Sequence, residues 1–174
     1  SYGLANVNNS DNNVPINNIS ITVDAKSTAM GISSSNGDIT FNEGTILSNS
    51  KTDNAYGIKG KIMTFNDGKI IVETLSTNSS YYYSYGLSGS IINMNSGYIK
   101  AKSGGMSIPV DSNTSNGNIT INSGTLISEA KVYSHGVRIT KGDITINNVY
   151  IDSKSQNKNS FGVCNNNGTS TITT

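Results

Sequence analysis

The stretch that decides the fold reads Gly-Asn-Ile-Thr-Ile-Asn-Ser-Gly-Thr-Leu and runs from Gly117 to Leu126. It alternates apolar and polar side chains, turns at an Asn and a Gly, and then resumes the alternation. Alternation with period two is typical of half-buried β-strands, and Asn and Gly are residues that tight turns favour. The stretch therefore predicts two short strands joined by a tight turn.

Three blocks of this kind recur along the whole chain. The block that ends in Asn122 also occurs at 14–17, 39–42, 63–66, 92–95, 144–147 and 170–173. The block that follows the turn, at 125–128, also occurs at 20–23, 45–48, 69–72, 98–101 and 150–153. A third block, with Gly before an aliphatic residue, occurs at 1–4, 29–32, 55–58, 84–87, 134–137 and 160–163, and we assign a degenerate copy to 105–108. No segment shows a helical period.

Three short strands in each repeat of about 26 residues predict an all-β parallel β-helix, in which each strand pairs with its equivalent ~4.8 Å away in the next coil. We expect one solenoid domain over residues 1–174 with about six to seven coils. We expect it to be right-handed, because parallel crossover connections are overwhelmingly so. Both ends fall inside the repeat, so we interpret the chain as a segment of a longer repeat protein.

The composition fits this fold and excludes several classes of function. Hydrophobic residues make up 34% of the chain and charged residues only 13%, with a net charge of +1. A chain this polar cannot build a thick central core, but a solenoid is stabilised by stacking of its coils. No basic patch indicates nucleic-acid binding, and the apolar runs are too short for membrane insertion as a helix. The single cysteine excludes an intrachain disulfide.

Stacking converts each repeated position into a column along the axis. One turn position holds an Asn in every coil, and the amide of each Asn can bond the amide of the next. An Asn at this position also tolerates left-handed backbone angles. We therefore predict a structural asparagine ladder made of Asn17, Asn42, Asn66, Asn95, Asn122 and Asn147.

Two features are candidate ligand-binding surfaces. The first is an outward stripe formed by Thr40, Thr64, Asn93, Thr120 and Thr145. It is either a β-branched solvent face or a repetitive surface that faces a glycan or, as a more remote alternative, ice. The second is Tyr81, Tyr82 and Tyr83, which fall in the longest loop between coils. They either contact a sugar or a protein or latch the corner of a coil.

Two further outward columns favour contact with a neighbour or with solvent. One exposes three aliphatic residues and consists of Thr22, Leu47, Ile71, Lys100, Ile127 and Asp152. It is either a set of scattered surface aliphatics or a patch that another molecule covers. The other mixes charges of both signs, as a solvated or weakly paired ladder does, and consists of Asp24, Asn49, Glu73, Lys102, Glu129 and Lys154.

The residues that carry catalysis in other proteins do not gather here. His135, the only histidine, falls in a column of aromatic residues and Met, where we align it with Met106. Cys164 aligns with Pro109 and Arg138, and no base neighbours it. Asp38 and Asp143 share a turn position but lie ~15 Å apart by coil spacing. We therefore expect no catalytic site, no metal site and no cofactor.

The pattern from Gly117 to Leu126 resembles the pectate-lyase-like right-handed β-helix superfamily. It is most similar to the non-catalytic members found in bacterial adhesins, autotransporter passengers and adhesin-like cell-surface proteins. The resemblance covers essentially the whole chain and implies an extracellular or cell-surface setting. The catalytic Asp and Arg clusters of the enzymatic members have no matching positions here.

These observations lead to three functional hypotheses. The first is a non-enzymatic adhesin or structural rod. The second is a carbohydrate-binding β-helix module, and the third is a fragment of a polysaccharide lyase or hydrolase. Partners expected under the first two are a host or cell-wall glycan, a surface protein, or further copies of the chain that associate end to end or laterally.

Overall fold

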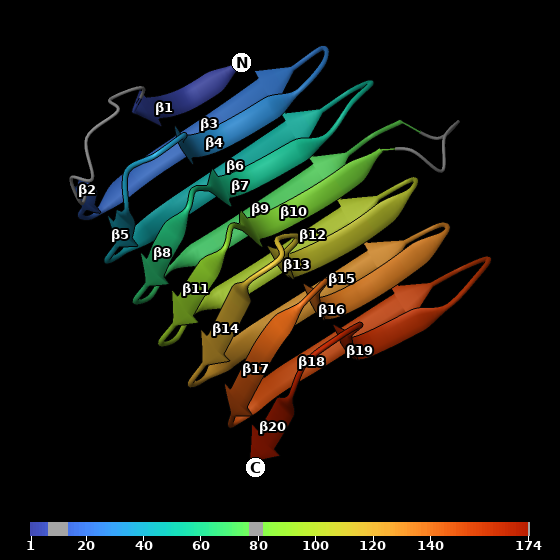
Figure 1. The fold of residues 1–174 in the computed structure, drawn as a ribbon. Coiled ribbons are helices and arrows are strands. Elements are labelled where there is room, and N and C mark those ends of the chain that lie inside the picture. Colours follow the sequence, from blue (N-terminus) through green and yellow to red (C-terminus); the bar gives the residue numbers. More distant parts are fainter. Residues whose placement is uncertain (7–13, 77–81, 174) are drawn as a thin grey trace.

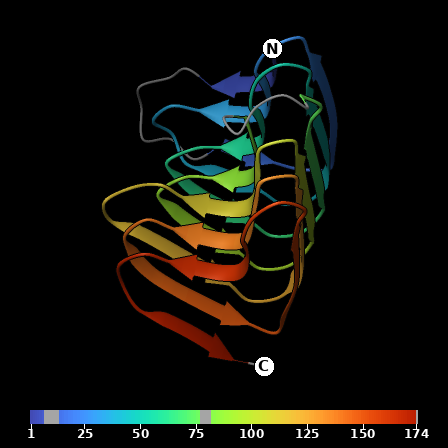
Figure 2. The same ribbon diagram turned by 90° about the vertical axis from the view of Figure 1, so that its right-hand side faces the viewer.

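The computed structural model describes residues 1–6, 14–76 and 82–173 and confirms the predicted β-solenoid (Figure 1). Each coil contributes one strand to each of three parallel sheets, and the described residues contain no helix. The coils follow one another along the axis from the N-terminus to the C-terminus, as Figure 2 shows from the side. The sheets are called A, B and C, in the order in which the chain visits them.

The twenty strands divide between the sheets in strict rotation. Sheet A contains β1 (Tyr2–Asn6), β4 (Ala29–Ser34), β7 (Ala55–Lys59), β10 (Tyr83–Ser88), β13 (Met106–Ser112), β16 (Tyr133–Ile139) and β19 (Ser160–Asn165). Sheet B contains β2 (Val14–Ile16), β5 (Ile39–Phe41), β8 (Ile62–Phe65), β11 (Ile91–Met94), β14 (Gly117–Ile121), β17 (Gly142–Asn147) and β20 (Ser170–Thr173). Sheet C contains β3 (Ile19–Ala25), β6 (Gly44–Ser50), β9 (Lys69–Thr74), β12 (Tyr98–Ser103), β15 (Gly124–Ala130) and β18 (Val149–Ser155).

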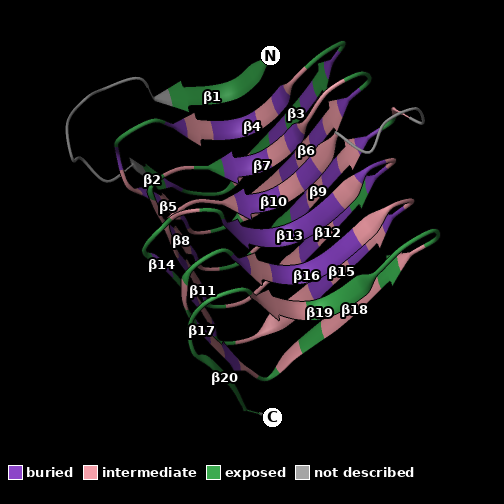
Figure 3. Ribbon diagram, turned by 45° about the vertical axis from the view of Figure 1, so that its right-hand side comes forward, coloured by how far each residue is buried: buried purple, intermediate pink, exposed green. Residues whose placement is uncertain are grey.

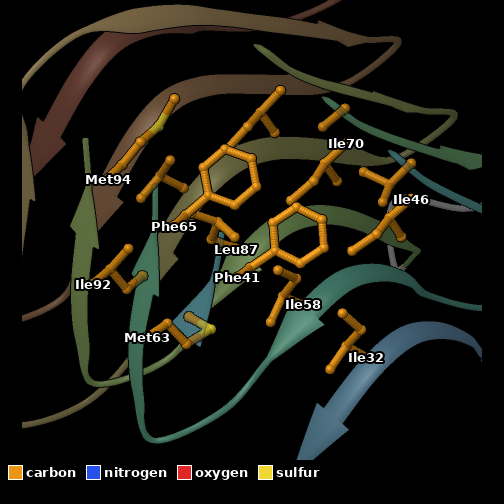
Figure 4. Packing of buried hydrophobic residues seen from close by; sticks show 14 of the residues in the cluster. Ile32, Phe41, Ile46, Ile58, Met63, Phe65, Ile70, Leu87, Ile92 and Met94 are labelled. Carbon is orange, nitrogen blue, oxygen red and sulfur yellow. The ribbon is translucent and has the colours of Figure 1, made fainter. Parts of the chain in front are cut away.

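The core is a thin set of columns in which like residues stack on like. Phe41 and Phe65 lie one above the other with ring centroids 5.3 Å apart and nearly parallel planes (Figure 4). Isoleucines of sheet C, such as Ile46 and Ile70, are fully buried beside them. Each such side chain contributes roughly 1.5–3 kcal/mol on burial. The inward side chains are buried in the middle coils, and burial falls off in β1, β19 and β20 (Figure 3).

The glycine of the third block marks a close approach between sheets A and C. A Cβ atom added to Gly57 would lie 2.4 Å from Cγ2 of Ile70 and 2.6 Å from the carbonyl oxygen of Gly86. The backbone of sheet A can therefore approach the isoleucine column of sheet C only because no side chain is present there.

The fifth coil corrects the alignment made from the sequence. The degenerate block was assigned to 105–108, but the strand pairing places Ile108 beside Tyr85 and Val110 beside Leu87. The block therefore lies two residues later, at 107–110, and Pro109 takes the place of the usual Gly. Because that Gly is missing, the block had no marker in the sequence.

A buried serine cluster explains the true register of the fifth coil. The hydroxyl of Ser107 lies 2.6 Å from the hydroxyl of Ser128, in the corner between sheets A and C. Ser134 follows in the next coil and bonds the hydroxyls of Ser128 and Ser153, each at 2.7 Å. An inward serine at the first position of the block is therefore satisfied by hydroxyls of sheet C, and this arrangement fixes Ser107 above Ser134.

We expect Gly57→Ala to lower the free energy of unfolding by about 1–3 kcal/mol, because the added methyl group overpacks the contact with Ile70 and Gly86. The matched control is Gly162→Ala in the last coil, where the nearest atom to the added Cβ is Ile151 Cγ2 at 4.0 Å. The control should change stability by less than about 0.5 kcal/mol. Urea unfolding of both variants measures the difference, and equal losses would contradict the close-approach explanation.

Candidate functional site

The threonine stripe lies on the outer face of sheet B. Thr40, Thr64, Asn93, Thr120 and Thr145 occupy paired positions in β5, β8, β11, β14 and β17. All five side chains are half-buried. The stripe is therefore a regular column of small polar groups at the spacing of the strands, ~4.8 Å.

The six asparagines beside the stripe bond one another along the axis. From Asn42 onward, the Nδ2 of each donates to the Oδ1 of the Asn in the preceding coil, at 2.5 Å for Asn42, 2.6 Å for Asn66 and Asn95, 2.9 Å for Asn122 and 3.3 Å for Asn147. A ligand that bound the Thr stripe would meet amides whose main hydrogen-bonding groups already have partners.

The ladder asparagines do not take the left-handed backbone that the sequence suggested for them. Among the described residues, the non-glycine positions with positive φ are Asn18 at 46° and Asn148 at 47°. In the coils between them, the positive φ falls on the Gly two residues after the ladder Asn, as at Gly68 and Gly97. Amide bonding alone therefore explains the Asn at this position, because the Gly adopts the positive φ of the turn.

The tyrosine loop is shorter than the sequence indicated. Tyr81 lies outside the described residues, and Tyr82 is half-buried just before β10. Tyr83 is not in a loop, because it begins β10 and pairs with Met106. Its ring lies 5.8 Å from that of Tyr85. Tyr83 therefore belongs to the outer face of sheet A.

That face holds a groove of about 570 Å³, which is a candidate ligand site. Its floor contains Tyr2, Tyr56 and Tyr85, and its wall comes from the turns after the sheet A strands. The rings of Tyr56 and Tyr85 stack at 5.0 Å, and the Nζ of Lys59 lies 4.8 Å from the ring centre of Tyr56. Burial raises the pKa of the Tyr56 hydroxyl, so this group stays protonated and can donate a hydrogen bond.

A buried ion pair lies beside the groove, and its carboxylate, Asp111, is among the lining residues. The Nε of Arg138 donates to Oδ1 of Asp111 at 2.7 Å, and Asp111 is only 1% exposed. Burial raises the pKa of Asp111, while the hydrogen bond and charge of Arg138 act in the opposite direction. Sequence reasoning missed this pair because the alignment at the fifth coil was two residues off. In the true register Asp111, rather than Pro109, is the neighbour of Arg138 and the equivalent of Cys164.

His135 is a packed aromatic residue in the same column. It is 8% exposed, its ring lies 5.3 Å from that of Phe161, and its Nδ1 has no hydrogen-bond partner in the described part of the chain. Its coil neighbour is Ile108 rather than Met106, as the pairing of Ser107 with Ser134 requires. Burial first, and then the charge of Arg138, lower its pKa to about 4. The ring is therefore neutral at pH 7.

A second groove, of about 530 Å³, runs along the end of sheet C and is lined by Glu73, Lys102, Glu129 and Lys154 among others. Within residues 1–6, 14–76 and 82–173, no three His, Cys, Asp or Glu side chains lie close enough to hold a metal ion. No helix in that same part is long and apolar enough to cross a membrane.

We expect the free energy of unfolding to decrease as the pH falls from 6.5 to about 4, because the unfolded chain takes up a proton on His135 that the folded chain resists. The pKa of His135 is lower in the folded chain than in the unfolded chain, so its full contribution to stability is present above the unfolded pKa. Each unit of difference between the two pKa values corresponds to roughly 1.4 kcal/mol. His135→Phe should flatten the curve in this window, since the chain has no other histidine. Urea titrations at several pH values measure both curves, and an unchanged slope in the variant would refute the assignment.

No protein-family model, curated protein or solved structure matches this chain. The case for its function therefore depends on the geometry of its own residues.

Proposed function

We propose that the chain is a non-enzymatic extracellular or cell-surface β-helix that acts as an adhesin or structural rod, akin to the non-catalytic pectate-lyase-like proteins. The observation that carries this proposal is the continuity of its outward columns. The Asn ladder bonds successive coils from Asn17 to Asn147, and aromatic rings stack in the same direction on sheet A. Side chains repeated along one axis form long uniform faces, which suit a spacer or an adhesive surface.

The separation of Asp38 and Asp143 supports a role without catalysis at their turn position. Asp111 is the buried carboxylate of the described core and is held by Arg138. Asp38 and Asp143 are separated by the four strand steps from β5 to β17, about 19 Å at ~4.8 Å per step. Glycosidases need two carboxylates ~5–9.5 Å apart. This distance does not fit a shared cleft, and it is longer than the ~15 Å inferred from the repeat.

The second candidate function is carbohydrate binding, and the groove on sheet A favours it over the Thr stripe. Tyrosines combine a large apolar area with a polar tip, which suits sugar rings. Lys59, Lys61 and Asn113 line the same groove and offer hydrogen bonds to hydroxyl groups. The Thr stripe contains no aromatic ring, and none of its residues lines either of the two grooves described above.

The test of both functions uses the purified chain, coupled to beads and presented to arrayed glycans, cell-wall polysaccharides and host-cell surfaces, with and without Ca²⁺. An adhesin retains one of these surfaces and leaves the polysaccharides intact. Shortening of any polysaccharide by the chain would overturn the non-enzymatic proposal. A chain that retains none of the surfaces and degrades none of the polysaccharides supports the structural rod.

If a glycan is the ligand, we expect Tyr56→Ala to weaken its binding about tenfold or more, because the ring supplies contact area in the groove. Two variants serve as matched controls: Tyr98→Ala removes a ring from sheet C, and Thr120→Ala alters the stripe on sheet B. Both should bind as the unmodified chain does in the same array titration. A loss confined to Thr120→Ala would move the site to the stripe.

A further inference from the structure

Sheet C presents an outer face of three columns that has no covering element of its own in the described chain. The first column contains Ser20, Thr45, Lys69, Tyr98, Thr125 and Tyr150. The second is the aliphatic column of Thr22, Leu47, Ile71, Lys100, Ile127 and Asp152. The third is the charged column of Asp24, Asn49, Glu73, Lys102, Glu129 and Lys154. Their strands succeed one another from β3 to β18 (Figure 1).

The charged column is complementary to a second copy of itself that runs in the opposite direction. From β3 to β18 its charges run negative, neutral, negative, positive, negative, positive. Read in the opposite direction, Asp24 meets Lys154 and Glu73 meets Lys102. Only the pair of Asn49 with Glu129 lacks a charge on one side. In a two-fold interface the same surface of both copies meets, and each residue pair occurs twice. The charges of such a surface must therefore complement the same charges in the opposite order.

We propose that two copies of this chain pair face to face through sheet C, with their solenoid axes antiparallel. The two-fold axis lies in the interface along the strand direction and passes between β9 and β12. This operation sets each column on the same column of the partner and reverses the order of the coils. The proposal goes beyond the function proposed above and is independent of the groove on sheet A. The charged column lines the second groove, which therefore lies along one edge of the proposed interface.

The other two columns fit the same arrangement. In the aliphatic column Leu47 of one copy meets Ile127 of the other, so two half-buried apolar side chains cover each other. In the first column Lys69 meets Tyr98, a pair that is already a cation–π contact at 5.8 Å within one chain. At the axis itself Ile71 of one copy meets the aliphatic stem of Lys100 of the other, so the purely apolar contact in this column is limited to the two Leu47–Ile127 pairs.

Neighbouring registers are disfavoured. An axis through β12 would set Lys102 on Lys102 and Glu73 on Glu129, and like charges in contact oppose association. An axis between β12 and β15 would also set opposite charges together, Glu73 on Lys154 and Lys102 on Glu129, but it would leave β3 and β6 without partners. The register between β9 and β12 engages all six strands and avoids both faults.

The ion pairs within one chain do not use up the charges of this face. Lys102 lies 2.6 Å from Glu73, and Lys100 lies 2.9 Å from Glu129. Lys154 lies 2.5 Å from Asp152 of its own strand, and its side chain is 71% exposed. The side chain of Lys102 remains 53% exposed in its pair. These pairs sit at the surface, so a partner copy can extend them into a network, and salt should weaken it.

The size of the face predicts a weak dimer. Six strands at ~4.8 Å and about six residues at ~3.3 Å give a face of roughly 570 Å² per copy. Specific interfaces bury ~800 Å² per partner, so this one is near the low end of the range. We therefore expect dissociation in the micromolar range or weaker.

Asp24 and Lys154 give the decisive test, because they meet only across the proposed interface. In one chain they are five strand steps apart, ~24 Å. Sedimentation equilibrium of the 174-residue chain at low salt should show a monomer–dimer equilibrium. Asp24→Lys and Lys154→Asp should each raise the dissociation constant about tenfold, because each places like charges together twice per dimer. The double variant Asp24→Lys/Lys154→Asp should restore the original value.

Matched controls keep the net charge of each variant but place the change on another sheet or turn. Asp143→Lys, on β17, controls for Asp24→Lys, and Lys141→Asp controls for Lys154→Asp. Both should dimerise as the unmodified chain does. A chain that stays monomeric up to ~1 mM, single variants that match their controls, or a double variant that is no tighter than the single variants would each overturn the proposal.

Discussion

The constraint on which this structure depends is that each strand pairs in parallel with its equivalent one coil away. Parallel pairing in register places identical positions of the repeat above one another. A residue type that recurs at one position therefore forms a column along the axis. An Ile becomes an Ile column, a Phe stacks on a Phe as Phe41 does on Phe65, and an Asn becomes a chain of amides. A buried column can therefore hold only residues that tolerate their own kind as neighbours.

The like-on-like rule extends to the corner where sheets A and C meet, and it is broken on the outer face of sheet A. In the corner between sheets A and C, the chain places serines whose hydroxyls bond one another, with Ser134 reaching both Ser128 and Ser153. Small polar residues fit this corner because the backbones approach closely there, as the contact of Gly57 with the Ile70 column shows. On the outer face of sheet A, the fifth and sixth coils instead pair Asp111 with Arg138, so the repeat is not uniform there.

Most of the fold was readable from the sequence because period two and the recurring Gly and Asn are local signals. The strands, their sheets and the inward columns follow from them directly. The register at 105–108 was wrong because Pro109 replaces the Gly that marks the block elsewhere, and the feature that decides it is a contact with the distant Ser128. The groove could not be predicted for a similar reason. Tyr56 and Tyr85 align in the sequence. The groove beside them depends on the backbone conformation of the turns after the sheet A strands, and the sequences of these turns do not repeat.

The gradient of burial along the rod has a consequence for how the molecule opens. Ile70, Ile99 and Ile119 in the middle coils are fully enclosed, whereas the residues of β20 are all exposed. Each coil contacts only its neighbours, so opening proceeds as fraying from the two ends, one coil at a time. Amide hydrogens should then exchange in order of their distance from an end. A partner that covers one terminal coil would stop fraying from that end and slow exchange in the coils behind it, although it touches none of their residues.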